Sequence, residues 1–191
     1  MTLARTAQLD VLFEGYARMP HVAGTVSLIR DEGRVIVVDP GMVPDREVLL
    51  GPLRALGVRP EDVTDIVLSH HHPDHTLSVA LFPPVPVHDV QAVYEGDNWT
   101  DRPADGVHLT SSVQLLATPG HTPQDITTLV GTTDDVIALT HLWWTEQGPE
   151  EDPYAPDREQ LREQRERVIA QVTLVVPGHG AAFRPGASTP R

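Results

Sequence analysis

The sequence predicts an α+β fold in which two packed sheets are flanked by helices. Runs rich in β-branched residues recur along the chain and are separated by turns that contain Gly, Pro or Asp. Two segments, residues 44–56 and 157–170, change to a helical period. Because these segments stand between groups of paired strands, we expect each sheet to pack against the other on one face and against a helix on the opposite face.

The first half of the chain is expected to supply one sheet and its helix. Two β-branched runs joined by Asp31-Glu32-Gly33 give the strongest signal, because this spacing is typical of a hairpin. The helix at 44–56 has a plausible start at Pro44-Asp45 and a plausible stop at Gly57. The other expected elements are an edge strand at 9–17, a turn at 19–21, strands at 64–68 and 85–87, a short helix at 76–81, and a polar loop at 95–106 that carries Trp99.

The second half of the chain is expected to supply the other sheet. Strands are predicted at 107–110, 113–118, 126–130, 136–140 and 173–177. An acidic, proline-rich loop precedes the helix at 157–170, whose apolar stripe consists of Leu161, Val168 and Ile169. We expect its four arginines to lie on a solvated face, with Glu163 and Arg167 as an i,i+4 pair, and the tail after residue 185 to be loose.

Length and composition favour one domain spanning residues 1–191, since 191 residues with 40% apolar content suit one sizeable core. No apolar run approaches the roughly 20 residues of a spanning helix, and no secretory signal is evident at the N-terminus, so we expect a cytoplasmic protein without a membrane partner. The net charge of −13 disfavours a general affinity for nucleic acid. The chain has no cysteine, so any metal must be bound by histidine and carboxylate.

The stretch LSHHHPDHT directly follows the buried strand predicted at 64–68. It places four side chains that can bind a metal, those of His70, His72, Asp74 and His75, within six residues. Imidazole and carboxylate are common ligands of zinc and its first-row neighbours. Positions 70 and 72 can turn two imidazoles toward one ion, while the adjacent pair at 74 and 75 can face a second. A histidine-rich surface loop is the alternative interpretation.

Together with three further motifs, this stretch resembles the metallo-β-lactamase-fold hydrolases. The pattern H-x-H-x-D-H is joined by VVDPG with Asp39, TPGHT with His121 and PGHG with His179. The resemblance covers nearly the whole chain and implies the four-layer αβ/βα sandwich. It also implies that Asp39 orients a metal ligand from behind, although Asp before Pro-Gly is equally typical of a plain turn. We expect the isolated residues His21, His88 and His108 to be surface or structural histidines.

The resemblance also implies a ligand set for one or two zinc ions, with iron and manganese as alternatives. His70, His72 and His121 would bind one ion, and Asp74, His75 and His179 the other. Metal binding lowers the pKa of bound water to about 7, which would supply a hydroxide nucleophile. Asp74 would hold this nucleophile and later pass a proton to the leaving group.

One position departs from the family pattern. Where most members have an Asp that bridges the two ions, this chain has His141. It is expected to be an extra metal ligand, a substrate-facing acid or hydrogen-bond donor, or a structural histidine. If two ions bind, the loss of the bridging carboxylate leaves the site more positive, which would favour an anionic substrate.

Three functions remain open from the sequence. The first is a metal-dependent hydrolase of a small ester, thioester, lactone or related acyl compound. The second is a phosphodiesterase or ribonuclease acting on RNA, which the resemblance to an RNA-processing animal member of the family suggests and the acidity of the chain disfavours. The third is a non-catalytic metal-dependent binding or sensor module. The oligomeric state is left open.

Overall fold

The computed structural model describes residues 3–191, whose strands form a seven-stranded sheet, a five-stranded sheet and a separate hairpin. The seven-stranded sheet has the order β1 (Gln8–Phe13), β4 (Val26–Asp31), β5 (Arg34–Val38), β6 (Asp65–Val67), β7 (Val87–His88), β8 (Ala92–Glu95) and β9 (Asn98–Asp101). The five-stranded sheet has the order β10 (His108–Thr110), β11 (Val113–Ala117), β12 (Ile126–Gly131), β13 (Val136–Thr140) and β14 (Leu174–Pro177). Strands β2 (Tyr16–Arg18) and β3 (His21–Ala23) form the separate hairpin.

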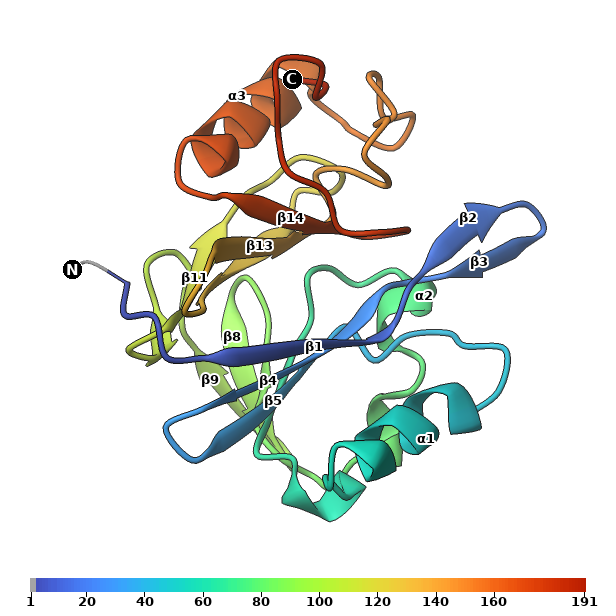
Figure 1. The fold of residues 1–191 in the computed structure, drawn as a ribbon, viewed down its shortest axis with the longest axis vertical. Coiled ribbons are helices and arrows are strands. Elements are labelled where there is room, and N and C mark those ends of the chain that lie inside the picture. The colour runs from blue at the N-terminus through green and yellow to red at the C-terminus, as the bar shows by residue number, and fades with distance from the viewer. Residues whose placement is uncertain (1–2) are drawn as a thin grey trace.

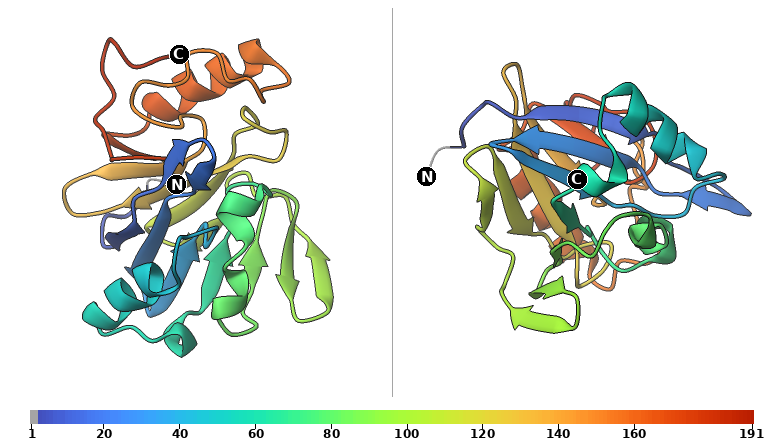
Figure 2. Two further views of the ribbon diagram at one scale, coloured as in Figure 1. Left: turned by 90° about the vertical axis from the view of Figure 1, so that its right-hand side faces the viewer. Right: turned by 90° about the horizontal axis from the view of Figure 1, so that it is seen from below.

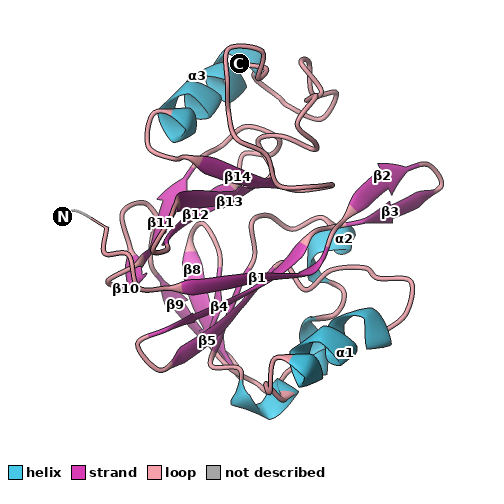
Figure 3. Cartoon of the chain, viewed as in Figure 1, coloured by secondary structure: helices cyan, strands magenta, loops and turns pink. Residues whose placement is uncertain are grey.

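Four layers are stacked in the order helix, sheet, sheet, helix (Figure 1). Helix α1 (Glu47–Ala55) covers the outer face of the seven-stranded sheet and buries Leu49 and Leu53 there. Helix α3 (Arg158–Ile169) covers the five-stranded sheet in the same way (Figure 3). A third apolar cluster, which includes Ile36 and Leu115, fills the space between the sheets. The predicted αβ/βα sandwich is therefore confirmed.

The hairpin of β4 and β5 formed where the turn residues predicted it. The two turn residues, Glu32 and Gly33, have φ values of 48° and 79°. Positive φ at both residues of a two-residue turn gives a twist that matches the twist of the flanking strands. Strand β1 pairs with β4 at the edge of the sheet, as predicted, but it ends at Phe13, and residues 16–17 of the predicted strand belong to β2. The turn at 19–21 connects β2 to β3, a hairpin that the sequence did not predict.

The prediction of a polar loop at 95–106 was wrong for its first half. Strands β8 and β9 form a hairpin there, at the edge of the seven-stranded sheet (Figure 2). Tyr94 lies opposite Trp99, and their rings meet edge to face at 4.7 Å, an arrangement that stabilises paired strands. All four residues of β9 are exposed, so no apolar alternation marked the strand in the sequence.

The short helix predicted at 76–81 begins earlier and is interrupted. Helix α2 (Pro73–Thr76) lies within the histidine-rich motif, and a 3₁₀ turn (Val79–Leu81) follows it. Pro73 occupies the first helical position, where its missing N–H costs no hydrogen bond. As a result Asp74 and His75 lie on a helical turn, whereas His70 and His72 lie on the loop before it.

Two predictions about helix α3 were wrong. Arg165 in α3 is fully buried, and its guanidinium donates to the carbonyl oxygens of Leu142, Pro149 and Glu150. The i,i+4 pair in this helix is Arg162–Glu166, because Arg167 reaches Asp105 instead of Glu163.

The tail is also packed rather than loose, since the indole N–H of Trp143 donates to the carbonyl of Pro190 at 2.9 Å. Buried donors need an acceptor, and this one is supplied by the tail. Within residues 3–191, no helix combines the length and apolar character that crossing a membrane requires.

Candidate metal centre

The sheet topology brings the predicted ligands to one edge of the sandwich. Strands β5 and β6 are parallel, and in the other sheet β11, β13 and β14 run in a common direction, because β12 is antiparallel to both of its neighbours. The carboxyl ends of parallel strands meet at one edge of a sheet. The motif residues follow these ends: Asp39 after β5, residues 70–75 after β6, His121 after β11, His141 after β13 and His179 after β14.

The first group of candidate ligands consists of His70, His72 and His121. Nδ1 of His72 lies 3.0 Å from Nε2 of His70 and 3.0 Å from Nε2 of His121. Tetrahedral zinc with Zn–N distances of about 2.0–2.1 Å separates its nitrogen ligands by about 3.4 Å. The three nitrogens therefore stand near the spacing that one ion would need.

Two of these imidazoles are held from behind through their other nitrogen. Nδ1 of His70 lies 2.9 Å from Oγ of Ser69, and Nδ1 of His121 lies 2.7 Å from the carboxylate of Asp152. A carboxylate only accepts hydrogen bonds, so Nδ1 of His121 carries the proton and its Nε2 presents a lone pair to the group. Such contacts fix the orientation and tautomer of a metal-binding histidine.

The second group consists of Asp74, His75 and His179. Oδ2 of Asp74 lies 3.4 Å from Nε2 of His75 and 3.5 Å from Nε2 of His179. The other nitrogens are again occupied, since Nδ1 of His75 contacts Asp39 at 2.9 Å and Nδ1 of His179 donates to the carbonyl of Ala23 at 2.9 Å. Nε2 of His75 is buried without a hydrogen-bond partner, because its contact with Asp74 is poorly aligned.

Asp39 combines the two roles that the sequence left open. Its backbone has a φ of 54°, the left-handed conformation that Asp tolerates in turns. Its carboxylate accepts from the backbone N–H of Ser69 at 2.6 Å and contacts His75 with the other oxygen. Gly41 lets this turn approach α2, since a Cβ at position 41 would lie 1.6 Å from the carbonyl oxygen of Asp74.

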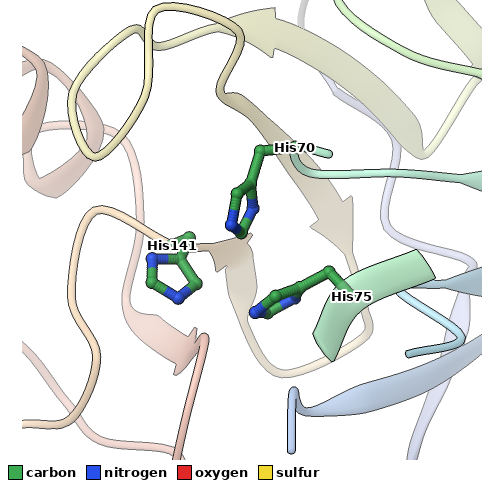
Figure 4. A group of neighbouring side chains, drawn as sticks. All are labelled: His70, His75 and His141. Carbon is green, nitrogen blue, oxygen red and sulfur yellow. The ribbon is translucent and has the colours of Figure 1, made fainter. Parts of the chain in front are cut away.

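His141 lies between the two groups. Figure 4 shows it together with His70 and His75, each from a different segment of the chain. Its ring centre is 4.1 Å from that of His121, and its Nε2 is 3.1 Å from Nε2 of His179. Its Nδ1 is buried and has no partner. Gly178 makes room for this ring, because a Cβ there would lie 2.2 Å from Cδ2 of His141.

Burial keeps most of these imidazoles uncharged. It lowers the pKa of His70 and of His141 well below the usual value, helped by the neighbouring histidines, and it lowers the pKa of His179 to about 4. Burial also opposes the charge of His75, but the carboxylates of Asp39 and Asp74 outweigh it and raise the pKa of His75 to about 9. Neutral imidazoles keep the lone pairs that metal binding requires.

The donor set fits a divalent metal. Nitrogen and oxygen ligands without sulfur suit zinc, iron and manganese. In each group three donor atoms lie within 4.8 Å of one another, and a bound cation would give the orphaned Nε2 of His75 the partner that it lacks. Burying an unpaired polar atom costs free energy unless something satisfies it.

A cleft of about 530 Å³ opens above the candidate ligands. Apolar and aromatic side chains make up much of its wall, and several candidate ligands form its base. The cleft is lined by Ala17, Met19, Val22, Met42, His72, Pro73, Asp74, His121, His141, Trp144, Tyr154 and His179. A concave, largely apolar site with a few convergent polar groups is typical of small-molecule binding.

Other histidines lie outside the centre. His71, between two candidate ligands, turns away and contacts Asp89 at 3.0 Å. His88 is buried between Asp65 and Arg102, which matches the structural role predicted for it, and His21 and His108 are exposed surface residues as predicted.

Four residues around the centre were missed from the sequence: Ser69, Trp144, Asp152 and Tyr154. Ser69 and Asp152 contact ligand histidines, and the two aromatic residues line the cleft. The most important of the missed residues is Asp152, which lies among several other acidic residues in a proline-rich loop. No periodicity or spacing in the sequence distinguishes it from the solvated carboxylates beside it.

Comparison with known proteins shows that the sequence similarity extends over most of the chain and is not limited to the motifs. Residues 19–181 match the family model of the Metallo-beta-lactamase superfamily. The chain belongs to this superfamily. Metallo-beta-lactamase domain-containing protein 1 of Mus musculus is 35% identical over 159 residues, which are 78% of this chain and 60% of that protein. The chain spans about half of an uncharacterised relative from Caenorhabditis elegans and three fifths of the mouse protein.

More distant matches have named activities. A hydroxyacylglutathione hydrolase of Albidiferax ferrireducens is 34% identical over 104 residues, half of this chain and 37% of that enzyme. Among solved structures, a candidate metallo-beta-lactamase from Thermotoga maritima aligns with a TM-score of 0.74 at 19% identity, over 95% of this chain and 100% of that one. A quorum-quenching N-acyl homoserine lactone lactonase aligns with a TM-score of 0.63 at 20% identity, over 88% and 87% of the two chains. These structural likenesses establish the shared fold.

Proposed function

We propose that the protein is a metal-dependent hydrolase that acts on a small ester, thioester, lactone or related acyl compound. The observation that carries this proposal is the convergence of two groups of three candidate ligands, with members of both groups lining one cleft. Catalytic metal sites differ from structural ones in leaving coordination positions for water and substrate. Three protein ligands in each group leave such positions open.

The proposed ligands are His70, His72 and His121 for one ion and Asp74, His75 and His179 for the other. Zinc is the proposed metal, with iron and manganese as alternatives. A bound ion of this kind lowers the pKa of water and polarises the oxygen of a carbonyl group. Ser69, Asp152, Asp39 and the carbonyl of Ala23 hold four of the histidines through their second nitrogen.

Asp74 is the proposed proton carrier. It lines the cleft and is the sole carboxylate among the cleft-lining residues of the part of the chain described by the structure. Burial would raise its pKa, but His75 and His179 outweigh burial and lower the pKa of Asp74 to about 2. Its carboxylate is therefore ionised at neutral pH, and it can accept a proton from the attacking water and return it to the leaving group.

His141 is proposed to contact the metal centre directly. Its Nε2 lies as close to that of His179 as the nitrogens of the first group lie to one another. Because Nδ1 of His179 donates to the carbonyl of Ala23, Nε2 is the nitrogen of His179 that faces the centre, and Nε2 of His141 lies beside it. This arrangement favours a further metal ligand or a hydrogen-bond donor to substrate over a purely structural histidine.

The walls of the cleft favour an acyl substrate over a nucleic acid. Met19, Val22, Met42, Trp144 and Tyr154 supply apolar surface, and within residues 3–191 no Lys or Arg lines the cleft. Phosphate backbones are bound mainly through Lys and Arg. The relatives and structural neighbours named above include a hydroxyacylglutathione hydrolase and an N-acyl homoserine lactone lactonase, which supports a small acyl compound as substrate.

Metal analysis of the purified protein tests the ligand assignment. We expect one to two equivalents of zinc, iron or manganese, and the loss of at least one equivalent in His72→Ala, which removes the nitrogen shared by two close contacts. His108→Ala, at an exposed position, is the matched control and should keep the wild-type content. An unchanged metal content in His72→Ala would refute the assignment.

Turnover assays test the reaction. The metal-loaded protein should hydrolyse generic esters, thioesters or lactones faster than a phosphodiester, and a chelator should abolish the activity. Restoring the family residue in His141→Asp should raise the affinity for a second ion, because a carboxylate can bridge two ions. Activity on the phosphodiester alone would favour the ribonuclease alternative, and no activity on any substrate would favour a binding module.

A further inference from the structure

Both carboxylate oxygens of Asp152 accept hydrogen bonds, which link the candidate metal centre to the wall of the cleft. Asp152 is buried, and its Oδ2 accepts from Nδ1 of His121 at 2.7 Å and from the indole N–H of Trp144 at 2.8 Å. Its Oδ1 accepts from the backbone N–H of Tyr154 at 2.9 Å. All three neighbours are donors, so the side chain at this position must be an acceptor on both oxygens.

Two of these donors form an aromatic wall of the cleft. The rings of Trp144 and Tyr154 are stacked, with centroids 5.8 Å apart and an interplanar angle of 22°. Both rings lie beside the imidazole of His121, at 5.9 Å and 5.5 Å. Arg165 of helix α3 holds the loop that carries these two residues, because its guanidinium donates to the carbonyls of Pro149 and Glu150.

We propose that Asp152 is a positioning residue, which holds the proton of His121 on Nδ1 and sets Trp144 against the same imidazole. This inference rests on the proposed function, because it assumes that His121 binds a metal. With the proton on Nδ1, Nε2 of His121 offers its lone pair toward Nδ1 of His72. A ligand histidine with the opposite tautomer would present a proton where the metal needs an electron pair.

The Asp152→Asn substitution separates this role from simple packing. An amide has nearly the same shape as a carboxylate but has one acceptor oxygen and one donor nitrogen. If the oxygen stays with Tyr154, the NH₂ group faces both His121 and Trp144, and His121 must move its proton to Nε2 to accept from it. If the amide flips, the NH₂ group faces the N–H of Tyr154, so neither orientation satisfies all three donors.

Zinc affinity is the first measurement, by competition with a chromophoric chelator. We expect Asp152→Asn to bind the ion of the first group about 10–100-fold more weakly than the wild type, the range found when the hydrogen-bond partner of a ligand is removed. Asp157→Asn is the matched control, since Asp157 belongs to the same loop and caps α3 without contacting a ligand. Trp144→Phe removes one donor and keeps the contact of Asp152 with His121, so its zinc affinity should stay within about threefold of wild type.

The outcomes separate this inference from the proposed function. Zinc binding by the wild type with equal affinity in Asp152→Asn would overturn the inference and leave the proposed ligands standing, whereas a wild type that binds no zinc would overturn both. If Asp152→Asn does not fold, the tautomer is read in the wild type from nitrogen-15 correlation spectra of the zinc-loaded protein. His121 protonated on Nδ1, with its proton protected from exchange, is the expected result, and protonation on Nε2 would overturn the inference.

Discussion

At the scale of single residues, what distinguishes a candidate ligand such as His75 from a structural histidine such as His88 is whether its second ring nitrogen is already engaged by the surrounding protein. His75 and His179 each have one nitrogen engaged by the protein and the other directed into the centre. His88 has both nitrogens engaged, one by Asp65 and one by Arg102, so it has no lone pair to offer. An imidazole can serve a metal only through a nitrogen that nothing else uses.

Gly178 is expected to be intolerant of any side chain because of the imidazole beside it. In Gly178→Ala the new Cβ would overlap Cδ2 of His141, so the ring would have to leave its contacts with His121 and His179. We expect a loss of unfolding free energy of about 1–3 kcal/mol, the usual cost of overpacking. Urea unfolding of the metal-free protein measures it.

The double variant Gly178→Ala/His141→Ala provides the control for this prediction. Because the shorter side chain at 141 removes the overlap, the double variant should be more stable than the sum of the two single effects allows. Strictly additive effects would show that the overlap with His141 is not the cause.

At the scale of elements, the loop between β13 and α3 depends on one buried cation. Arg165 donates to Leu142 at 2.8 Å, to Pro149 at 2.8 Å and to Glu150 at 3.1 Å. Burial lowers the pKa of Arg165 to about 10, which still leaves the guanidinium charged at neutral pH. This helix residue thereby fixes the loop that carries Trp144 and Asp152 to the centre.

Replacing this cation should loosen the loop and destabilise the fold. Arg165→Met keeps an unbranched apolar stem but leaves the three carbonyl oxygens without their donor, so we expect a loss of about 3 kcal/mol in urea unfolding. Hydrogen exchange should accelerate in residues 142–152. The matched control is Arg162→Met, which removes the exposed pairs with Glu159 and Glu166 and should change stability little. Equal effects of the two variants would contradict the role of Arg165.

At the scale of the whole molecule, the fold concentrates uncharged imidazoles at the interface of its two sheets. His70, His141 and His179 are buried there with pKa values held below the usual range by burial. The unfolded chain binds protons on these residues below about pH 6.5, whereas the folded chain binds them only at lower pH. Acid therefore favours unfolding of the metal-free protein.

The lowered pKa of His179 should make the free energy of unfolding depend on pH. Its folded pKa of about 4 is below the unfolded value, so its contribution to stability is present above pH 6.5 and falls as the pH drops toward 4. We expect a slope of about 1.4 kcal/mol per pH unit from this residue between these limits. Urea unfolding in chelator measures the slope, which should be smaller in His179→Gln and unchanged in His108→Gln. A slope unaffected by His179→Gln would contradict the assignment.

Much of the fold could be predicted because the sequence patterns are local. The turn at Glu32-Gly33, the helix at Leu49 and Leu53 and the buried run after Thr173 each carry their signal within a few residues. The hairpin at Tyr94 and Trp99 could not be predicted, since an exposed strand has no alternation between a buried and a solvated face.

The sequence by itself determined the residue types of the centre, because metal-binding side chains recur at the ends of predicted strands, and it determined the layered fold, because strand and helix periods alternate along the chain. Only the tertiary structure decided what lies behind most of the ligands, and which histidine Asp39 contacts. The contact of His121 with Asp152 joins residues 31 positions apart. A hydrogen bond of that kind depends on where two loops meet in space, and the loop of Asp152 carries no local pattern that records its partner.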